Sequence, residues 1–184
     1  VVTYTGELVT VAELTDAQGT ATYAISMAND LSEVLACGRV ADTPISNEIA
    51  AEPVSVDQTA LYFATEDSIV KLYYDGAADA FTRAWQRSLP IRRRTGTTPT
   101  LMNAPNGDQL AIIVDGACAV TNVLNGLIVC DDAGEPAQLL AVRREDDTGG
   151  RPEVMQADLP SFMRTVVISP AVRGDLVVVA NYIG

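Results

Sequence analysis

The chain contains no histidine and few of the other residues on which enzymes commonly rely. Its 184 residues include three cysteines and one tryptophan. Histidine is the usual general base of Ser-His-Asp and Cys-His catalysis and the commonest zinc ligand. The sequence therefore excludes hydrolases of these two types. A glycosidase needs only two carboxylates and is not excluded, but the sequence does not show which two of its Asp and Glu residues would lie at the required separation.

Basic residues are also scarce. There are 12 Lys and Arg residues against 24 Asp and Glu, and the formal net charge is −12. An acidic surface repels phosphate backbones, so nucleic acid is excluded as a partner. Solubility is the simplest interpretation of this charge, and recognition of a cationic partner is the alternative. The sequence has no run of 18 or more apolar residues that would predict a membrane span.

Helical periodicity is nearly absent. Only Met155–Met163 could form a turn or two of helix, and Pro160 limits it. Short β-branched or aromatic runs bounded by Gly, Pro, Asn and Asp recur instead, which is typical of strands. The expected strands are Val1–Tyr4, Leu8–Leu14, Ala21–Ser26, Val34–Arg39, Ala60–Thr65, Ser68–Tyr74, Phe81–Ser88, Thr100–Met102, Leu110–Asp115, Ala117–Val123, Leu127–Asp131, Leu139–Arg143, Val166–Ser169 and Leu176–Tyr182.

Three segments repeat one order of features: a proline, a short alternation, a polar corner and a β-branched run. They are Glu52–Asp67, Thr98–Gly116 and Ser169–Gly184. The close spacing of turn signals restricts the fold to a sandwich, a barrel or a propeller. A unit of about 45 residues with four short strands is typical of a propeller blade. We therefore expect an all-β fold, a β-propeller of four-stranded antiparallel blades; a β-sandwich is the alternative, although it has no reason to repeat at this period.

At about 45 residues per blade, the chain has room for about four blades in a single propeller domain. Four blades are at the low limit for ring closure. We therefore expect the chain to contribute part of a larger propeller, with the remaining blades supplied by further sequence or by a partner. The expected boundaries are blades at 1–50, 51–97 and 98–143, an insertion loop at 144–160, and a partial blade at 161–184.

The segment Ala60–Leu89, "ALYFATEDSIVKLYYDGAADAFTRAWQRSL", contains the clearest unit. Asp67 lies in its first turn, Leu72 in its second strand, Asp75-Gly76 at its second turn and Trp85 in its third strand. In this order it resembles the PQQ-like repeat of β-propellers, and weaker matches extend the resemblance over about two thirds of the chain. The segment departs from the repeat where "AADAF" replaces a Thr-Gly-Lys turn, and only one unit carries a tryptophan.

The resemblance implies a periplasmic or secreted protein. The missing histidine and the lack of any catalytic constellation favour a non-enzymatic binding or scaffold module whose partner is another protein or the remaining blades. Part of a PQQ-dependent, quinoprotein-like oxidoreductase is the alternative. Quinoprotein dehydrogenases of this fold stack the quinone on an indole and use a pair of adjacent cysteines. This chain has no adjacent cysteines. We therefore interpret Trp85 as a residue that packs between blades.

The one basic cluster of the chain lies in "RRRTGTTPT". Guanidinium groups beside hydroxyls and free backbone N–H groups can form an anion pocket. The candidate ligand-binding residues are Arg92, Arg93, Arg94, Thr97 and Thr98. The alternative is that these arginines pair with nearby carboxylates.

Two further candidates concern calcium and a disulfide. Asp131 and Asp132 offer the hard oxygen ligands that calcium prefers, although they do not fit the EF-hand spacing and solvated loop charge is the favoured explanation. Cys118 and Cys130 lie on either side of a turn-rich stretch and are candidates for a disulfide; the alternative is two buried free thiols. No cofactor is indicated firmly, and calcium and PQQ are the candidates.

Overall fold

A computed structural model of the protein describes residues 7–15, 17–30, 49–65, 68–88, 97–115, 120–124, 127–130, 137–145, 154–160 and 169–180. Every regular element within these ranges is a β-strand, so the expectation of an all-β fold is confirmed. In this part of the chain no helix is long and apolar enough to cross a membrane. All strand pairs in the same ranges are antiparallel.

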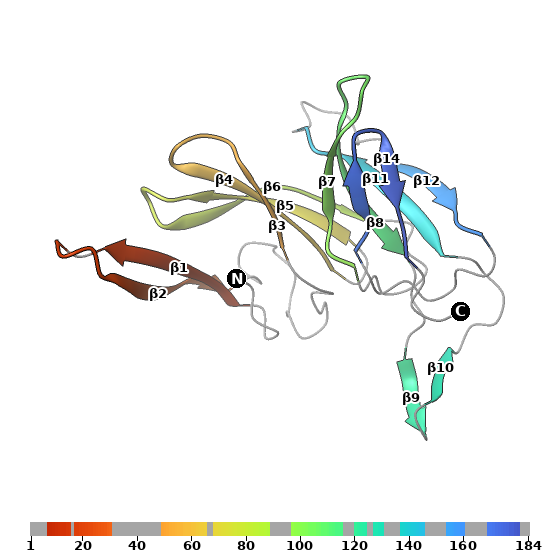
Figure 1. Ribbon diagram of the computed structural model, residues 1–184, viewed down its shortest axis with the longest axis horizontal. Coiled ribbons are helices and arrows are strands. Elements are labelled where there is room, and N and C mark those ends of the chain that lie inside the picture. Colours follow the sequence, from red (N-terminus) through yellow and green to blue (C-terminus); the bar gives the residue numbers. More distant parts are fainter. Residues whose placement is uncertain are drawn as a thin grey trace.

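The first sheet has four strands from one continuous segment. They are β3 (Ala50–Pro53), β4 (Gln58–Ala64), β5 (Ser68–Asp75) and β6 (Ala80–Ser88), and they lie side by side in chain order. Each strand pairs antiparallel with the next, which is the arrangement of a β-meander. The sheet is drawn in orange and yellow in Figure 1.

The second sheet also has four strands in chain order. They are β7 (Thr100–Asn103), β8 (Gln109–Asp115), β11 (Gln138–Arg143) and β12 (Val154–Asp158). Between β8 and β11 the chain forms a separate hairpin of β9 (Val120–Leu124) and β10 (Leu127–Cys130). Figure 1 shows this hairpin projecting away from the sheet.

Two more hairpins complete the described strands. β1 (Glu7–Thr15) pairs with β2 (Ala21–Asp30), and β2 approaches the outer strand β6 of the first sheet. β13 (Ala171–Arg173) pairs with β14 (Leu176–Val178), and β13 lies beside β7 of the second sheet.

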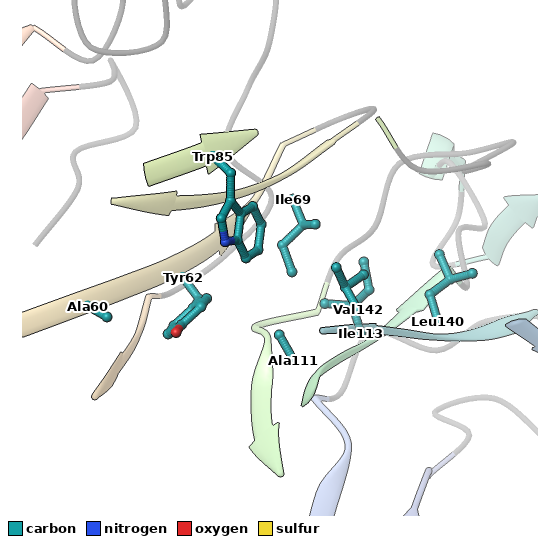
Figure 2. Packing of buried hydrophobic residues seen from close by; sticks show 8 residues of the cluster. All are labelled: Ala60, Tyr62, Ile69, Trp85, Ala111, Ile113, Leu140 and Val142. Carbon is teal, nitrogen blue, oxygen red and sulfur yellow. The ribbon is translucent and has the colours of Figure 1, made fainter. Parts of the chain in front are cut away.

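The two four-stranded sheets pack against each other through a shared apolar core. Figure 2 shows side chains from both sheets gathered in this core. The first sheet contributes Ala60, Tyr62, Ile69 and Trp85, and the second contributes Ala111, Ile113, Leu140 and Val142. Alternate residues of a strand point to opposite faces of its sheet, so β8 directs only two of its five apolar residues toward this core.

Both four-stranded sheets are also covered on their other faces. On the second sheet, Leu110 and Ile112 of β8 pack with Val172 and Val177 of the β13–β14 hairpin. On the first sheet, strand alternation places three fully buried side chains opposite the shared core. They are Phe63, Val70 and Leu72. Each sheet is therefore an inner layer of a stack.

The β3–β4, β7–β8 and β13–β14 hairpins share one feature of sequence. In each, the turn ends on an aspartate directly before the second strand, at Asp57, Asp108 and Asp175. The last two turns also contain Gly107 at φ 91° and Gly174 at φ 62°, a conformation that glycine adopts without steric cost. The repeat seen in the sequence therefore corresponds to a repeated hairpin.

Two expectations need correction. The segment 144–160 is not only an insertion loop, because Val154–Asp158 forms β12, the fourth strand of the second sheet. For the same reason the start of Met155–Met163 is strand and not helix. The insertion that does occur within this sheet separates β8 from β11 and contains the β9–β10 hairpin.

Candidate functional site

A row of three large side chains crosses the first sheet on the face that meets the second sheet. Tyr62 of β4 lies opposite Lys71 of β5, and Lys71 lies opposite Trp85 of β6. All three are buried. A lysine in such a position must find oxygen partners, because an ammonium group without partners is costly to remove from water.

The cations of the first sheet find these partners on the second sheet. Lys71 Nζ donates a hydrogen bond of 2.9 Å to the backbone carbonyl of Arg144, which directly follows β11. Arg87 Nη1 donates one of 3.1 Å to the carbonyl of Arg143. These carbonyls lie at the end of a strand, where the sheet ladder no longer uses them all. Side chains from β5 and β6 thus bind the end of β11.

Arg144 reaches back in the opposite direction. Its Nη1 lies 2.6 Å from Oε2 of Glu52 on β3, and its Nη2 donates to Oδ1 of Asn103 on β7. The Tyr62 hydroxyl donates to the same Glu52 oxygen at 3.3 Å. The side chain of Arg144 is 3% exposed and that of Glu52 is 30% exposed. We call Glu52, Tyr62, Lys71, Arg87 and Arg144 the inter-sheet polar cluster.

Aromatic rings line this cluster. The Arg87 guanidinium carbon lies 4.1 Å from the centroid of the Trp85 ring, and Lys71 Nζ lies 4.8 Å from that of Tyr73. Tyr62 and Trp85 contact each other in a tilted arrangement with centroids 6.1 Å apart. Cation–π contacts of this kind are worth about 0.5–2 kcal/mol each, more when they are desolvated. The rings therefore help to hold the buried cations.

Burial raises the pKa of the Tyr62 phenol above its ordinary value. The positive charges of Lys71 and Arg144 oppose this rise, and the carboxylate of Glu52 adds to it. The phenol therefore stays protonated at neutral pH and keeps its donor hydrogen for Glu52.

Three buried N–H groups find no acceptor within the described ranges. They are Trp85 Nε1, Arg143 Nε and Arg144 Nε. Figure 2 shows the indole nitrogen of Trp85 on the side of the ring nearer Tyr62. Unsatisfied buried donors are rare in proteins, and an ordered water can satisfy them where space allows.

The cluster offers cations and hydrogen-bond donors together with a single carboxylate, and that carboxylate is engaged with Arg144. Lys71 and Arg87 also bind across to the second sheet, at the carbonyls of Arg144 and Arg143. General acid–base chemistry needs a group that can reach a substrate. The arrangement instead fixes how the first sheet sits on the second.

The threonines of the candidate anion pocket have structural partners. The Thr97 hydroxyl donates to the carbonyl of Val114 and accepts from its N–H, at 3.2 and 3.1 Å. The Thr98 N–H donates to the Ser169 hydroxyl at 2.9 Å. Thr97 thus continues the contact with β8 beyond the start of β7. Thr98 binds the segment that precedes β13.

The other candidate residues lie largely outside the described ranges. Arg92, Arg93, Arg94, Asp131, Asp132 and Cys118 all fall there. Cys130 ends β10, opposite Val120 of β9. Among the residues with described positions, no group of three or more Cys, Asp or Glu side chains is placed to hold a metal ion.

The interpretation of Trp85 as a packing residue agrees with its position in the core between the sheets. Sequence reasoning missed the rest of the cluster. A signal was present at Lys71, which interrupts the apolar run of β5 and, by strand alternation, shares a face with the buried Ile69. An inward-facing lysine in a buried strand predicts oxygen partners on the neighbouring layer.

Comparison with known proteins assigns the chain to no family. No family model matches the sequence, and no curated protein or solved structure matches the chain. These results neither support nor exclude the resemblance of Ala60–Leu89 to the PQQ-like repeat.

Replacing Glu52 by glutamine tests the inter-sheet contact. Glu52→Gln leaves the Arg144 guanidinium without its carboxylate, so we expect the free energy of unfolding to fall by about 1–3 kcal/mol. Urea denaturation measures this change. The matched control is Glu145→Gln, the same chemical change at an exposed position. Equal effects of the two substitutions would show that the contact does not stabilise the protein.

The raised pKa of Tyr62 predicts a loss of stability in alkali. Its contribution is complete below the unfolded-state pKa of about 10 and is lost as the pH rises through the higher folded-state pKa. Tyr62→Phe removes the titrating group. We therefore expect the stability difference between the wild type and Tyr62→Phe to shrink above about pH 10 in urea denaturation. A difference that stays constant up to pH 11, about one unit beyond that value, would contradict this account.

Proposed function

We propose that this chain forms blades of a β-propeller that acts as a non-enzymatic binding or scaffold module. The observation that carries the proposal is the position of the second sheet. Its strands lie in chain order, and its two faces are covered by the segment before it and the segment after it. Blades of a propeller bury their faces against their neighbours in this serial way.

A two-sheet sandwich accounts less well for these features. In a sandwich each sheet packs on one face, and outward-facing polar residues alternate with the core residues along each strand. Here Phe63, Val70 and Leu72 are fully buried on the face of the first sheet that points away from the second. The contact of β13 with β7 adds support, because both are first strands of their units and first strands adjoin near a propeller axis.

Binding is favoured over quinone-dependent oxidation by the surroundings of Trp85. The indole is 7% exposed, and the Arg87 guanidinium lies 4.1 Å from its ring centroid. A quinone stacked on the same ring would have to displace either Arg87 or the neighbouring sheet. The oxidoreductase alternative therefore has no specific support at this residue.

The turns of the first sheet offer a surface for a partner. The β3–β4 and β5–β6 turns adjoin, since the Gly76 N–H donates to the Asp57 carbonyl at 2.7 Å. Val56 is 97% exposed at the first of these turns, and Asp75 and Asp79 are exposed at the second. We call Val54, Val56, Asp57, Asp75 and Asp79 the turn surface. Apolar side chains among carboxylates suit a protein partner that carries cationic and apolar groups.

Affinity capture tests the binding role. Immobilised wild-type protein is expected to retain a partner from an extract of the source organism, and Val54→Ser/Val56→Ser should lose it. Met155→Ser is the matched control, because Met155 is an exposed apolar residue on β12 of the second sheet. Retention that is equal for all three proteins would contradict a role for the turn surface.

A second measurement addresses the enzymatic alternative. The protein is titrated with pyrroloquinoline quinone and calcium while tryptophan fluorescence and reduction of an electron-acceptor dye are followed. A binding module predicts no saturable quenching and no dye reduction with alcohols or sugars. Quenching that saturates together with dye reduction would overturn the proposed function in favour of an oxidoreductase.

A further inference from the structure

The turn between β7 and β8 contains an asparagine followed directly by a glycine, Asn106-Gly107. An asparagine before a glycine is prone to deamidation, because glycine has no side chain to hinder attack by its own backbone nitrogen on the asparagine side chain. Both residues are exposed, and nothing lies within 4 Å of the position that a Cβ on Gly107 would take. The turn therefore leaves room for the ring that this reaction forms.

Asp108 binds the side-chain amide of Asn106 at both of its polar atoms. The Asp108 N–H donates to Asn106 Oδ1 at 3.1 Å, and Asn106 Nδ2 donates to Asp108 Oδ2 at 2.9 Å. The first bond supplies a donor to the oxygen on which negative charge develops when a nucleophile attacks the amide carbon. The second bond holds the nitrogen that leaves as ammonia in this reaction.

A backbone hydrogen bond restrains the attacking nitrogen. The Gly107 N–H donates to the carbonyl of Ala104 at 2.9 Å, and this bond has to open before the nitrogen can lose its proton and attack. The bond lies at the tip of an exposed hairpin, where local opening costs little free energy. We propose that Asn106 is a site of slow, spontaneous deamidation that loosens the β7–β8 hairpin.

The reaction needs only water as a co-reactant. A bond forms between Gly107 N and Asn106 Cγ, and the bond from Cγ to Nδ2 breaks. The Nδ2 nitrogen leaves as ammonia and takes the proton that Gly107 N gives up. The product is a cyclic succinimide, which water opens at either of its carbonyls. Opening yields aspartate or isoaspartate at position 106.

Either product removes the contact that the Asn106 amide makes with the Asp108 carboxylate. A carboxylate at position 106 cannot donate to Asp108, and the two negative groups repel each other across the distance at which amide and carboxylate now bind. Arg143 Nη2 lies 3.3 Å from Asp108 Oδ2, and this one cation cannot neutralise two carboxylates. Isoaspartate also adds a methylene group to the main chain of the turn. This displaces the Ala104 N–H from the Asp108 carbonyl to which it donates at 2.8 Å.

Peptide mapping by mass spectrometry tests the modification. The folded protein is incubated at mildly alkaline pH and sampled over time, and we expect Asn106 to be converted to a mixture of isoaspartate and aspartate. Asn103 is the matched internal control, because it is exposed in the same hairpin but is followed by Ala104. Conversion should be many-fold faster at Asn106 than at Asn103. An Asn106 that keeps its amide as long as Asn103 does would overturn the proposal.

A double-mutant cycle tests the effect on the hairpin, because Asn106→Asp introduces the carboxylate of the product directly. We expect Asn106→Asp to lower the urea concentration at the midpoint of unfolding. In protein that already carries Asp108→Asn the same change should lower this midpoint much less, since no charge at position 108 repels the new carboxylate. An equal decrease in both backgrounds, or none in either, would show that the proposed repulsion does not loosen the hairpin. Neither test involves a partner at the turn surface, so its outcome is independent of the proposed function.

Discussion

The fold depends on the burial of β8 on both of its faces. Ala111 and Ile113 pack in the core shared with the first sheet, and Leu110 and Ile112 pack beneath the β13–β14 hairpin. Apolar burial contributes about 25 cal/mol for each Å² removed from water, and an inner strand gains it on both sides. β8 therefore contributes strongly to holding the stack together.

Apolar packing alone does not fix the angle or the register of two sheets. The inter-sheet polar cluster adds that information, because Lys71, Arg87 and Arg144 reach their partners only in one arrangement. A buried ion pair is weak support for stability, since desolvation offsets much of its attraction. A buried charge that has lost its partner destabilises a protein by more than the intact pair stabilises it. Two misaligned sheets would leave such charges unpaired and are therefore disfavoured. We infer that the cluster mainly selects this arrangement of the two sheets and adds less to the free energy of unfolding.

The sequence predicted the strands that are apolar on both faces or alternate clearly. The run "LAIIV" gave β8, and "LYFA" and "SIVKLYY" gave most of β4 and β5. It missed β3, β12 and β13. The sequences of β3 and β12, "AAEP" and "VMQAD", lack both alternation and β-branched residues apart from one valine, and β13, "AVR", is only three residues long. Such edge strands form because a neighbouring strand offers its hydrogen bonds, and a single segment does not reveal that neighbour.

The candidate site was harder to predict than the fold. Thr97 stood out beside the basic cluster, yet its hydroxyl serves the backbone of Val114, a contact that only the tertiary structure brings about. Glu52 and Arg144 carry no local motif and meet across two sheets. Sequence indicates a buried lysine such as Lys71 more readily than it indicates the residues that receive it.

Native-state hydrogen exchange tests most directly whether the two sheets form one packed unit. Ile113→Ala opens a cavity in β8, on the face that meets the first sheet. If the sheets depend on each other, the amides of β5 in the first sheet should lose as much protection as those of β8 in the second. Wild-type protection in β5 beside reduced protection in β8 would show that the first sheet is stable without the second, and would contradict the account.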